Sequence, residues 1–490
     1  MNERKTDNRY DVAVIGGGVV GCAVLRELTK YRLRAVLLEK RFDLAEGISK
    51  GNSGVIHAGF NVPPGSLKAR TNAAGLRTIY DLAERLRVPH RRTGKLVVAF
   101  DDEGRNRLVE LKTQGDRNRT PGLEIIGENA IRALEPRIRG RWALLSPHTG
   151  IISPYEFTMA LAESAYQNGA DVRLGAELTA VEVRPDGFGL SSPTGPVSAR
   201  WVVNCAGLRA DEVASLVGPA EYRVYPYRGE YLISDKTAGE LLGRPIYPVP
   251  PQNDSFLGVH LTPTMEGPIL VGPSTAFVGD KEDTASTRAV MDSLKADAYR
   301  LLPELRGFPF IHAYAGLRPK LVGPDGRGGI ADFVVTESDR RPRWINLLGI
   351  ESPGLTAAPA LAEMVADMIG TREDLPLRSD FESGLPARPR FALLDDAARS
   401  DAAASDPDWG EMVCRCEHVT RAEVTAAIRN PFAAVSMDAI KRRTRCGMGR
   451  CQGGFCGPRI VEILQAEGVK LEEITKRGGD SRLVFGRIKT

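Results

Sequence analysis

The feature that most constrains the fold is a glycine-rich turn, GGGVVG, at residues 16–21. A short, apolar and β-branched run, YDVAVI (10–15), precedes the turn, and the largely apolar segment CAVLRELTKY (22–31) follows it. This order predicts a buried parallel strand, a tight turn and a helix whose first N–H groups can face phosphates. Gly16 suits the turn, Gly18 the close approach of a pyrophosphate, and Gly21 the packing of helix against strand.

The second predicted strand, RAVLLEK (34–40), ends in Glu39 and Lys40, which we predict to bind the cofactor. Glu39 lies at the spacing from which an acid accepts a hydrogen bond from a ribose hydroxyl, which favours FAD or NAD over a phosphorylated ribose. A flavin enzyme reduced by NADH usually needs a second fingerprint, and the strand ADVRLG (170–175) is not followed by one. The sequence therefore predicts FAD; a glycine-rich turn in an unrelated α/β domain is the weaker alternative.

Length and charge narrow the class of protein. A chain of 490 residues is long enough for about two to four domains. Its 66 Lys and Arg against 62 Asp and Glu leave a formal charge of +4 without a long run of one sign, so nucleic acid is not an expected partner. The N-terminal residues show no signal-peptide pattern, and no stretch approaches about 18 consecutive apolar residues. We expect a cytoplasmic protein that reaches the inner face of a membrane only through a partner subunit.

Five of the seven cysteines lie between residues 414 and 456. Cys414 and Cys416 form a CxC pair, and RTRCGMGRCQGGFC (443–456) carries Cys446, Cys451 and Cys456. An odd, clustered set in a cytosolic chain favours metal ligation over disulfides. Four thiolates suit either a 2Fe-2S cluster or zinc, and structural zinc sites prefer CxxC pairs, so the cluster is the favoured reading.

The residues around these cysteines have a chemistry that suits a cluster. Glycines at 447, 449, 453, 454 and 457 leave backbone N–H groups free to approach sulfur. Arg443, Arg445 and Arg450 either stabilise the negative charge of a cluster or face water. Before this region, residues 371–410 are rich in Pro, Asp, Ser and Ala and read as a linker with one short helix near ALLDDAARSD (392–401). After the CxC pair, TRAE (420–423) predicts the capped start of a helix.

Several segments between the glycine turn and the linker resemble a known family. They are KGNSGVIHAGFNVPPGSLKAR (50–70), TGKLVVA (93–99), SPHTGIISP (146–154), VVNCAGLRAD (202–211), YRGEY (227–231), IYPVPP (246–251), FLGVHLTP (256–263), GLRPK (316–320) and GIESPGLT (349–356). They resemble the D-amino-acid-oxidase-like flavoproteins. Within that superfamily, the chain is similar to the branch of FAD-dependent glycerol-3-phosphate and L-2-hydroxyglutarate dehydrogenases over roughly residues 10–370.

The resemblance implies an α/β protein with a Rossmann-like FAD-binding domain of the D-amino-acid-oxidase type and a mixed-sheet α+β substrate domain. The FAD-binding segments would be about 10–80, 145–215 and 330–370, and the substrate-domain segments about 81–144 and 216–329. A small helical 2Fe-2S domain (411–490) would follow the linker. The residues that the resemblance places around FAD are Gly47, Ser49, Asn52, Ser53 and Gly54, then Cys205, Ala206 and Gly207, then Gly354, Leu355 and Thr356. Cys205 itself reads as a small buried apolar residue.

Oxidation of a secondary alcohol needs an acceptor for the hydroxyl proton while a hydride leaves for the flavin N5. His57, in the turn that follows the flavin-binding segment, and His260, on a strand expected to face the flavin, are the candidate acceptors. Either histidine could instead hydrogen-bond the flavin without transferring a proton. Arg318 in GLRPK is the expected anchor for a substrate phosphate or carboxylate, with Lys320 and Arg228 as weaker candidates.

The C-terminal region resembles the bacterioferritin-associated-ferredoxin-like (BFD-like) 2Fe-2S domain that ends the anaerobic type of glycerol-3-phosphate dehydrogenase catalytic subunit. The resemblance implies Cys414, Cys416, Cys451 and Cys456 as ligands, because the position of Cys446 is commonly aliphatic in the resembling proteins. Free-standing members of that domain use CxxC for the second pair, whereas this chain has CxxxxC. Cys446 and Cys451 also form a CxxxxC pair, so the alternative that Cys446 replaces Cys456 as a ligand stays open.

Together the two resemblances imply an enzyme that oxidises sn-glycerol 3-phosphate to dihydroxyacetone phosphate and passes electrons through the 2Fe-2S domain to a partner subunit or a quinone. Oxidation of L-2-hydroxyglutarate is an alternative, because the loop segments resemble the hydroxyglutarate enzymes more closely. Oxidation of an amine or imino acid is another, because some opine and proline dehydrogenases have a similar C-terminal domain. An electron-transfer subunit without its own substrate is a further alternative, which Arg318 and the histidines disfavour. The sequence leaves the electron acceptor and any hetero- or homo-oligomer open.

Overall fold

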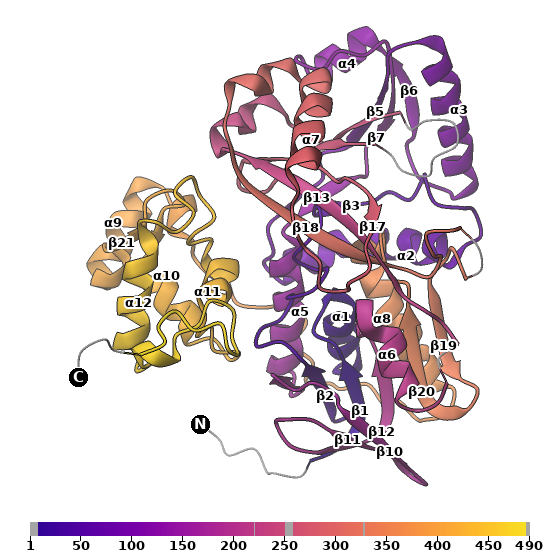
Figure 1. Cartoon of the computed structure of the whole chain (residues 1–490), viewed down its shortest axis with the longest axis vertical. Coiled ribbons are helices and arrows are strands. Elements are labelled where there is room, and N and C mark those ends of the chain that lie inside the picture. Colours follow the sequence, from indigo (N-terminus) through magenta and orange to yellow (C-terminus); the bar gives the residue numbers. More distant parts are fainter. Residues whose placement is uncertain (1–7, 220, 250–257, 327–328, 487–490) are drawn as a thin grey trace.

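The computed structural model of the chain describes residues 8–219, 221–249, 258–326 and 329–486. Two of the quoted segments, 246–251 and 256–263, each have two residues outside this description. Figure 1 shows a large body made of two stacked sheets with their helices, and a smaller C-terminal domain beside it. In the described part of the chain no helix is long and apolar enough to span a membrane.

The lower sheet in Figure 1 is formed around the glycine turn. Its main path runs β10-β11-β12-β1-β2-β9, with β20 added beside β12 and β19 beside β20. The neighbouring pairs β20–β12, β12–β1, β1–β2 and β2–β9 are parallel, as the first strand–turn–helix–strand unit predicts, whereas β10–β11, β11–β12 and β19–β20 are antiparallel. The bounds are β1 Arg9–Ile15, β2 Ala35–Glu39, β9 Asp171–Leu174, β10 Ala180–Arg184, β11 Gly187–Ser191, β12 Val197–Asn204, β19 Val334–Ser338 and β20 Arg341–Leu348.

Both faces of this sheet are covered, which explains why its central strands are apolar throughout. Val12 and Val14 of β1 face a core shared with helices α1, α5 and α8, whereas Ala13 and Ile15 face a second core that contains Trp344. Helix α1 packs against both α5 and α8, and α2 packs against α8. The bounds are α1 Val19–Leu28, α2 Leu67–Arg85, α5 Pro154–Gln167, α6 Ala210–Ser215 and α8 Gly354–Gly370.

The upper sheet belongs to the second lobe of the body. Its order is β17-β13-β16-β15-β14-β5-β7-β6, with β18 also paired to β13, and it is mixed because β14 and β5 are parallel whereas the other pairs are antiparallel. The strands are β5 Lys95–Ala99, β6 Glu124–Gly127, β7 Trp142–Ser146, β13 Tyr225–Ser234, β14 Ile246–Pro248, β15 His260–Pro263, β16 Ile269–Gly272, β17 Ala276–Phe277 and β18 Phe310–Lys320, and the helices are α3 Asp102–Arg117, α4 Glu128–Leu134 and α7 Arg288–Leu301.

Two further features join the lobes. A three-stranded sheet of β3 (Val55–Ile56), β8 (Gly150–Ile152) and β4 (His90–Arg91) brings together segments from both. The long β13–β18 pair descends from the upper lobe, where Tyr227 is paired with Arg318 and Tyr231 with Tyr314. These observations confirm the fold class expected from the sequence: a glycine-turn α/β domain with a mixed-sheet second lobe.

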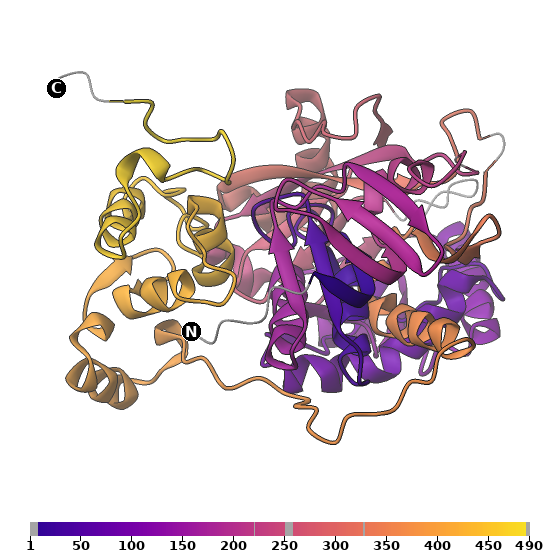
Figure 2. The same ribbon diagram turned by 90° about the horizontal axis from the view of Figure 1, so that it is seen from below.

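The C-terminal domain is small and mainly helical. It contains a two-stranded sheet, β21 (Met412–Cys414) and β22 (Val419–Thr420), and the helices α10 (Arg421–Ile428), α11 (Met437–Thr444) and α12 (Cys456–Ala466). Thr420 and Glu423 form the capping box at the start of α10 that TRAE predicts. Helix α11 was not predicted from the sequence. The linker contains α9 (Asp396–Ser405), and Figure 2 shows its extended part running along the outside of the lower lobe.

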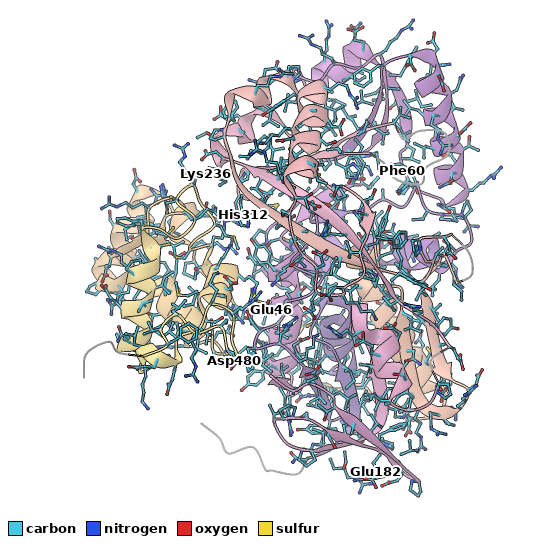
Figure 3. All side chains as sticks on the ribbon, in the orientation of Figure 1. Glu46, Phe60, Glu182, Lys236, His312 and Asp480 are labelled. Carbon is cyan, nitrogen blue, oxygen red and sulfur yellow. The ribbon has the colours of Figure 1, made fainter. Side chains whose placement is uncertain are left out.

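The C-terminal domain is docked on the body through charged side chains. Arg442 and Arg443 of α11 bond to Asp43, which follows β2, and Arg442 also bonds to Glu46. On the upper lobe, Lys236 donates to the backbone oxygen of Cys416. Figure 3 shows Glu46, Lys236 and His312 on the side of the body that faces the C-terminal domain. The cysteine-rich loops are therefore held against both lobes.

Candidate functional site

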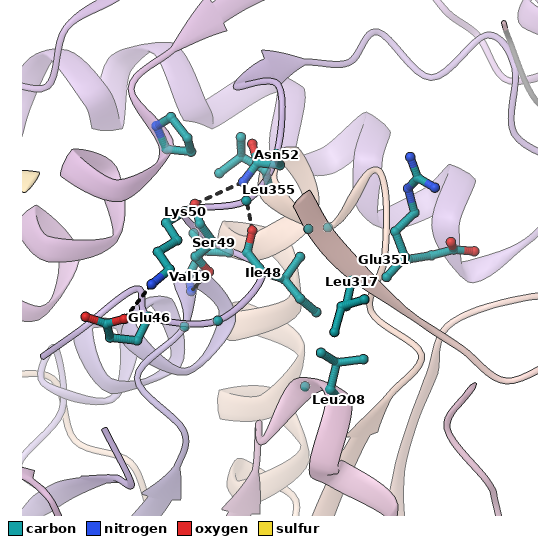
Figure 4. A pocket seen from close by; sticks show the side chains of 18 of the residues that line it. Val19, Glu46, Ile48, Ser49, Lys50, Asn52, Leu208, Leu317, Glu351 and Leu355 are labelled. Atoms are coloured by element: carbon teal, nitrogen blue, oxygen red, sulfur yellow. Dashed lines mark hydrogen bonds and ion pairs between the residues drawn. The ribbon is translucent and has the colours of Figure 1, made fainter. Parts of the chain in front are cut away.

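One cavity of about 2230 Å³ occupies the junction of the two lobes and extends to the C-terminal domain. The glycine turn and the loop at 46–54 line its lower part, the β13–β18 pair and β15 line its upper part, and the residues before α8 close one side. Figure 4 shows this wall, with Val19, Ser49 and Asn52 beside Leu317, Glu351 and Leu355. Residues far apart in the sequence therefore share one enclosed space.

The glycine turn has the geometry that a phosphate-binding turn requires. Gly16 has a φ of +108°, and a Cβ there would lie 2.6 Å from the backbone oxygen of Cys205. A Cβ on Gly21 would lie 2.0 Å from the backbone oxygen of Gly16, so this position also needs glycine. Gly16 and Gly18 line the cavity together with the first residues of α1, whose first turn carries no acidic side chain. An anionic pyrophosphate fits this helix N-terminus.

Glu39 lies at the end of β2 on the cavity wall, as predicted for a ribose ligand. Its carboxylate accepts hydrogen bonds from the backbone N–H groups of Gly17, at 2.6 Å, and of Arg41, at 2.8 Å. Burial nevertheless raises the pKa of Glu39, since it exceeds the opposing effect of these bonds. Lys40 also lines the cavity, but its ammonium pairs with Glu282 at 3.3 Å. The adenosine end of a bound dinucleotide thus has an acidic group available.

The loop at 46–54 is braced by its own side chains, as Figure 4 shows. The Ser49 hydroxyl accepts a hydrogen bond from the N–H of Val19 and ties the loop to the start of α1. The Asn52 amide donates to the backbone oxygens of Ile48 and Ser49 and accepts from the N–H of Gly54. A Cβ on Gly316 of β18 would lie 1.9 Å from the Gly51 oxygen, so loop and strand touch through glycines. The loop therefore forms a fixed wall.

The other predicted cofactor-binding residues fall into two groups. Ser53, Gly54, Ala206, Gly207, Gly354 and Leu355 line the cavity. Thr356 is fully buried behind this wall, where its hydroxyl accepts a hydrogen bond from the backbone N–H of His57 at 2.9 Å. In this arrangement Thr356 positions the His57 backbone.

His57 faces the cavity close to the residues before α8. Its Nε2 lies 3.3 Å from the hydroxyl oxygen of Ser352. Desolvation, with a smaller contribution from the charge of Lys95, lowers the pKa of His57 to about 3. The imidazole is therefore neutral at pH 7 and has a ring nitrogen that can accept a hydrogen bond.

His260 lies at the start of β15 on the same cavity wall. Its ring stacks on Tyr247 of β14, with centroids 3.5 Å apart and an interplanar angle of 3°. Desolvation holds the pKa of His260 well below its usual value, and Lys95, His57 and Arg318 add to the effect. The structure thus brings both candidate histidines to one end of the cavity, with His260 stacked on Tyr247.

Arg318 projects from β18 into this end of the cavity. Its guanidinium lies 5.5 Å from the ring centre of Tyr227 and hydrogen-bonds Tyr231, and it forms no ion pair with a carboxylate among the residues that the structure describes. Arg228 differs, because it pairs with Asp283 at 2.7 Å and with Glu230 at 3.2 Å. Arg318 is therefore the arginine whose charge is available to a ligand.

The charges at this end of the cavity do not balance. Glu351 pairs with Lys68 at 2.8 Å and with Lys320 at 3.2 Å. Burial alone would raise the pKa of Glu351, but Lys68, Lys320 and Arg318 together bring it below its ordinary value, so it is ionised. Three cations, Lys68, Lys320 and Arg318, thus act on this carboxylate, while Asp332 on the same cavity wall accepts hydrogen bonds from the backbone N–H groups of Leu67 and Lys68. An anionic ligand is the natural complement.

The five C-terminal cysteines lie together in two groups. The Sγ atoms of Cys414, Cys446 and Cys456 lie within 4.8 Å of one another, and all three side chains are buried. Cys416 contacts Cys451, which is exposed. Backbone N–H groups of Glu417 and Gly447 hydrogen-bond Cys414, and those of Gly453 and Phe455 hydrogen-bond Cys451. Thiolates with nearby N–H donors suit an iron–sulfur cluster.

The three arginines of the cysteine-rich loop pair with carboxylates, and of the three only Arg450 also faces water as one of the sequence-based alternatives expected, with its side chain 65% exposed. Arg443 pairs with Asp43, Arg445 pairs with Glu417 and Glu266, and Arg450 pairs with Asp235. Carboxylates thus balance their charges, and most of these carboxylates belong to the body of the protein. These arginines attach the C-terminal domain to the body, a role that depends on partners far away in the sequence.

Sequence reasoning missed three residues of the site. Ser352 was part of the segment GIESPGLT, but nothing local indicated its contact with His57. Tyr247 supports His260 from a strand that precedes it by thirteen positions. Lys95 was part of TGKLVVA, and its position at the start of an otherwise apolar strand was the available signal.

Comparisons with known proteins agree with this geometry. The family model described as FAD dependent oxidoreductase matches residues 11–368, and the model of the BFD-like 2Fe-2S binding domain matches residues 412–466. A glycerol 3-phosphate dehydrogenase of Caloramator mitchellensis is 37% identical over 485 residues, which cover 98% of this chain and 99% of that protein. The mitochondrial L-2-hydroxyglutarate dehydrogenase of Caenorhabditis elegans is 32% identical and covers 73% of this chain and 92% of that protein.

A solved structure shows the same fold with its cofactor. The dithionite-reduced L-α-glycerophosphate oxidase of Mycoplasma pneumoniae with FAD bound aligns with a TM-score of 0.71 and 28% identity, over 78% of this chain and all of that one. The glycine turn and the cavity fit FAD, and the cysteine set fits a 2Fe-2S cluster. The chain therefore belongs to the FAD dependent oxidoreductase family, as a flavoenzyme that binds FAD and carries a BFD-like 2Fe-2S domain at its C-terminal end.

Proposed function

We propose that this enzyme oxidises sn-glycerol 3-phosphate to dihydroxyacetone phosphate and passes the two electrons through its 2Fe-2S domain to a partner subunit or a quinone. One observation carries the proposal: the similarity to the glycerol 3-phosphate dehydrogenase of C. mitchellensis extends over 98% of this chain, including the cysteine-rich domain. The L-2-hydroxyglutarate dehydrogenase of C. elegans covers only 73% of the chain.

The residues at the cationic end of the cavity have the chemistry that this reaction needs. FAD bound along the glycine turn supplies the hydride acceptor. Arg318, which is free of carboxylate partners among the described residues, would hold the substrate phosphate with two parallel hydrogen bonds. His57 is neutral at pH 7 and is the candidate acceptor of the hydroxyl proton, and its Nε2 lies 3.3 Å from the Ser352 hydroxyl oxygen. His260, stacked on Tyr247, is the second candidate.

Oxidation of L-2-hydroxyglutarate is the second candidate function. The 32% identity to the C. elegans enzyme over the FAD-binding and substrate lobes favours it. A dicarboxylate would satisfy the same excess of positive charge around Glu351. Arg318 therefore does not distinguish the two substrates, and the choice between them needs experiment.

Anaerobic bleaching of the flavin absorbance tests the proposed reaction. The FAD-loaded protein is mixed without oxygen with sn-glycerol 3-phosphate, L-2-hydroxyglutarate or proline, and with NADH as a control. We expect rapid loss of the oxidised-flavin band with sn-glycerol 3-phosphate alone. Bleaching by L-2-hydroxyglutarate alone would support the second candidate, and bleaching by NADH alone would contradict a substrate dehydrogenase.

We also propose Cys414, Cys416, Cys451 and Cys456 as the cluster ligands. A 2Fe-2S centre takes two thiolates at each iron; Cys416 lies beside Cys451, and Cys414 has both Cys446 and Cys456 within 4.8 Å. The resemblance favours Cys456 as the partner of Cys414, because the position of Cys446 is commonly aliphatic in the resembling proteins. Cys456→Ala is therefore expected to lose most of its iron and acid-labile sulfide, whereas Cys446→Ala keeps both. Cys22→Ala, which changes a buried cysteine of α1, is the matched control and should keep both. Retention in Cys456→Ala with loss in Cys446→Ala would reverse the assignment.

A further inference from the structure

Lys95 is a buried cation without a hydrogen-bond partner. It is the first residue of β5, its side chain is 0% exposed, and no atom of the described structure bonds to its Nζ. The ammonium lies between two aromatic rings, 4.4 Å from the ring centre of Phe60 and 4.3 Å from that of Tyr247. A lysine in such a place is costly, because an ammonium buried without a hydrogen-bonded counter-charge loses its hydration.

Another buried lysine of the same region is fully partnered. Lys68 on α2 is 8% exposed, and its Nζ bonds to Glu351 at 2.8 Å and to the backbone oxygen of Ala331 at 3.2 Å. The fold thus satisfies one buried lysine and leaves the other unsatisfied. Where a sequence departs from a rule of folding in this way, function is the usual reason.

The surroundings of Lys95 connect it to the ligand cavity. It does not line the cavity itself, but Tyr247, on which its ammonium rests, does, and so do His57 and His260. The charge of Lys95 reaches both histidines, since it lowers the pKa of each. Within the described residues, the titratable groups that face it are His57, His260 and Tyr247, and Arg318 faces His260 from β18. No carboxylate stands among them.

We propose that Lys95 is a positioning residue for the anionic group of the substrate: its ammonium, one layer behind Tyr247 and His260, supplies a positive charge that a bound phosphate or carboxylate neutralises. The inference rests on the proposed function, because it adds a residue to the same substrate site. It also gives a functional reason for a buried lysine that, without a hydrogen-bond partner among the described residues, is costly to the stability of the fold.

The proposal predicts that the binding of an anionic ligand is coupled to proton uptake by Lys95. Burial lowers the pKa of Lys95 to about 7 in the ligand-free protein, so the side chain is partly neutral near pH 7. An anion in the cavity favours the charged form and therefore raises this pKa, and the anion in turn binds the charged form more tightly. Binding should take up a fraction of a proton per site near pH 7.5 and should weaken as the pH rises above about 7.

Titration of the oxidised, FAD-loaded protein with reaction products tests the proposal. Dihydroxyacetone phosphate and 2-oxoglutarate are ketones, so they occupy the site without reducing the flavin, and the change in flavin absorbance reports their Kd. The ratio of Kd in Lys95→Met to Kd in the wild type is expected to be tenfold or more at pH 6.5 and to approach 1 by pH 9. Neutral dihydroxyacetone, the matched ligand control, should give a ratio near 1 throughout.

Two further measurements separate this role from a structural one. Lys95→Met should have an unchanged or higher Tm because it removes an unpartnered buried charge, whereas Lys68→Met should have a lower Tm because it leaves Glu351 with one partner fewer. Calorimetry in two buffers should show less proton uptake on ligand binding in Lys95→Met than in the wild type. A less stable Lys95→Met, or a Kd ratio that does not depend on pH, would overturn the proposal.

The two product titrations also distinguish a failure of this inference from a failure of the proposed function. If only 2-oxoglutarate binds and shows the pH-dependent ratio, Lys95 is confirmed and the substrate is a 2-hydroxy acid. If neither product binds the wild type, the proposed function is contradicted, and the same ratio measured with inorganic phosphate tests Lys95 by itself.

Discussion

Replacing Arg318 with methionine is expected to lower kcat/KM for sn-glycerol 3-phosphate by roughly 100- to 1000-fold while leaving the FAD content unchanged. A desolvated pair between a guanidinium and an anion, once truncated, typically costs several kcal/mol, and each 1.36 kcal/mol is about a factor of ten. Arg318 is placed for such a pair, because it rests on Tyr227 and Tyr231 and forms no ion pair with a described carboxylate. Steady-state kinetics with an artificial electron acceptor gives the two constants.

A comparison of kcat/KM among three variants separates the loss of a substrate anchor from a general disturbance of the structure. Arg318→Lys keeps the charge but loses the planar fork, so it should recover only part of kcat/KM. Arg105→Met is the matched control: Arg105 also lies over an aromatic ring, 4.7 Å from the centre of Trp142, but it is exposed on α3. That variant should behave as wild type. Unchanged kcat/KM in Arg318→Met would remove Arg318 from the substrate site.

Local sequence was sufficient to predict the parts of the site that are local in origin. The turn at Gly16–Gly21 requires glycine because a side chain would collide with the backbone of Cys205, just after β12, or with that of the turn itself, and such requirements are visible in a short motif. The acid at the end of β2 and the capping box at Thr420 are likewise short-range features. Family resemblance supplied the positions of the loop at 46–54, which no periodicity indicates.

The rest of the site depends on contacts between distant parts of the chain. His57 meets Ser352 only because α8 packs against α2 and brings its preceding loop to the cavity. The local signal of Lys95 is only its position at the start of an apolar strand, and its lack of a hydrogen-bond partner among the described residues exists only in the folded structure. The arginines at 443, 445 and 450 were read as belonging to the cysteine loop, whereas their partners include Asp43, Glu266 and Asp235. Sequence shows that such charges exist but not which charges they meet.

The arginine–carboxylate contact beneath the C-terminal domain is the most buried of these long-range interactions. The side chains of Asp43, Arg442 and Arg443 are only 3%, 6% and 6% exposed, and Asp43 accepts hydrogen bonds from both arginines at 2.7 to 3.2 Å. Burial alone would raise the pKa of Asp43, but the hydrogen bonds and charges of Arg443 and Arg442 outweigh it and bring the pKa below its ordinary value. The stabilisation is therefore present above about pH 4 and is lost as the pH falls through the lower, folded-state pKa.

Asp43→Ala is accordingly expected to destabilise the attachment of the C-terminal domain by about 3 to 5 kcal/mol, because it leaves two buried guanidinium groups with Glu46 as the remaining acidic partner. Limited proteolysis at pH 7 should then cleave the linker (371–410) faster than in the wild type, and the first thermal transition should move to lower temperature.

The triple variant Asp43→Leu, Arg442→Met, Arg443→Met removes all three charges and should recover most of this loss, since a well-packed apolar contact can replace a buried ion pair. Asp186→Ala, which breaks an exposed pair with Arg9, is the control and should change little. Equal linker cleavage in Asp43→Ala and the wild type would show that other contacts hold the domain in place.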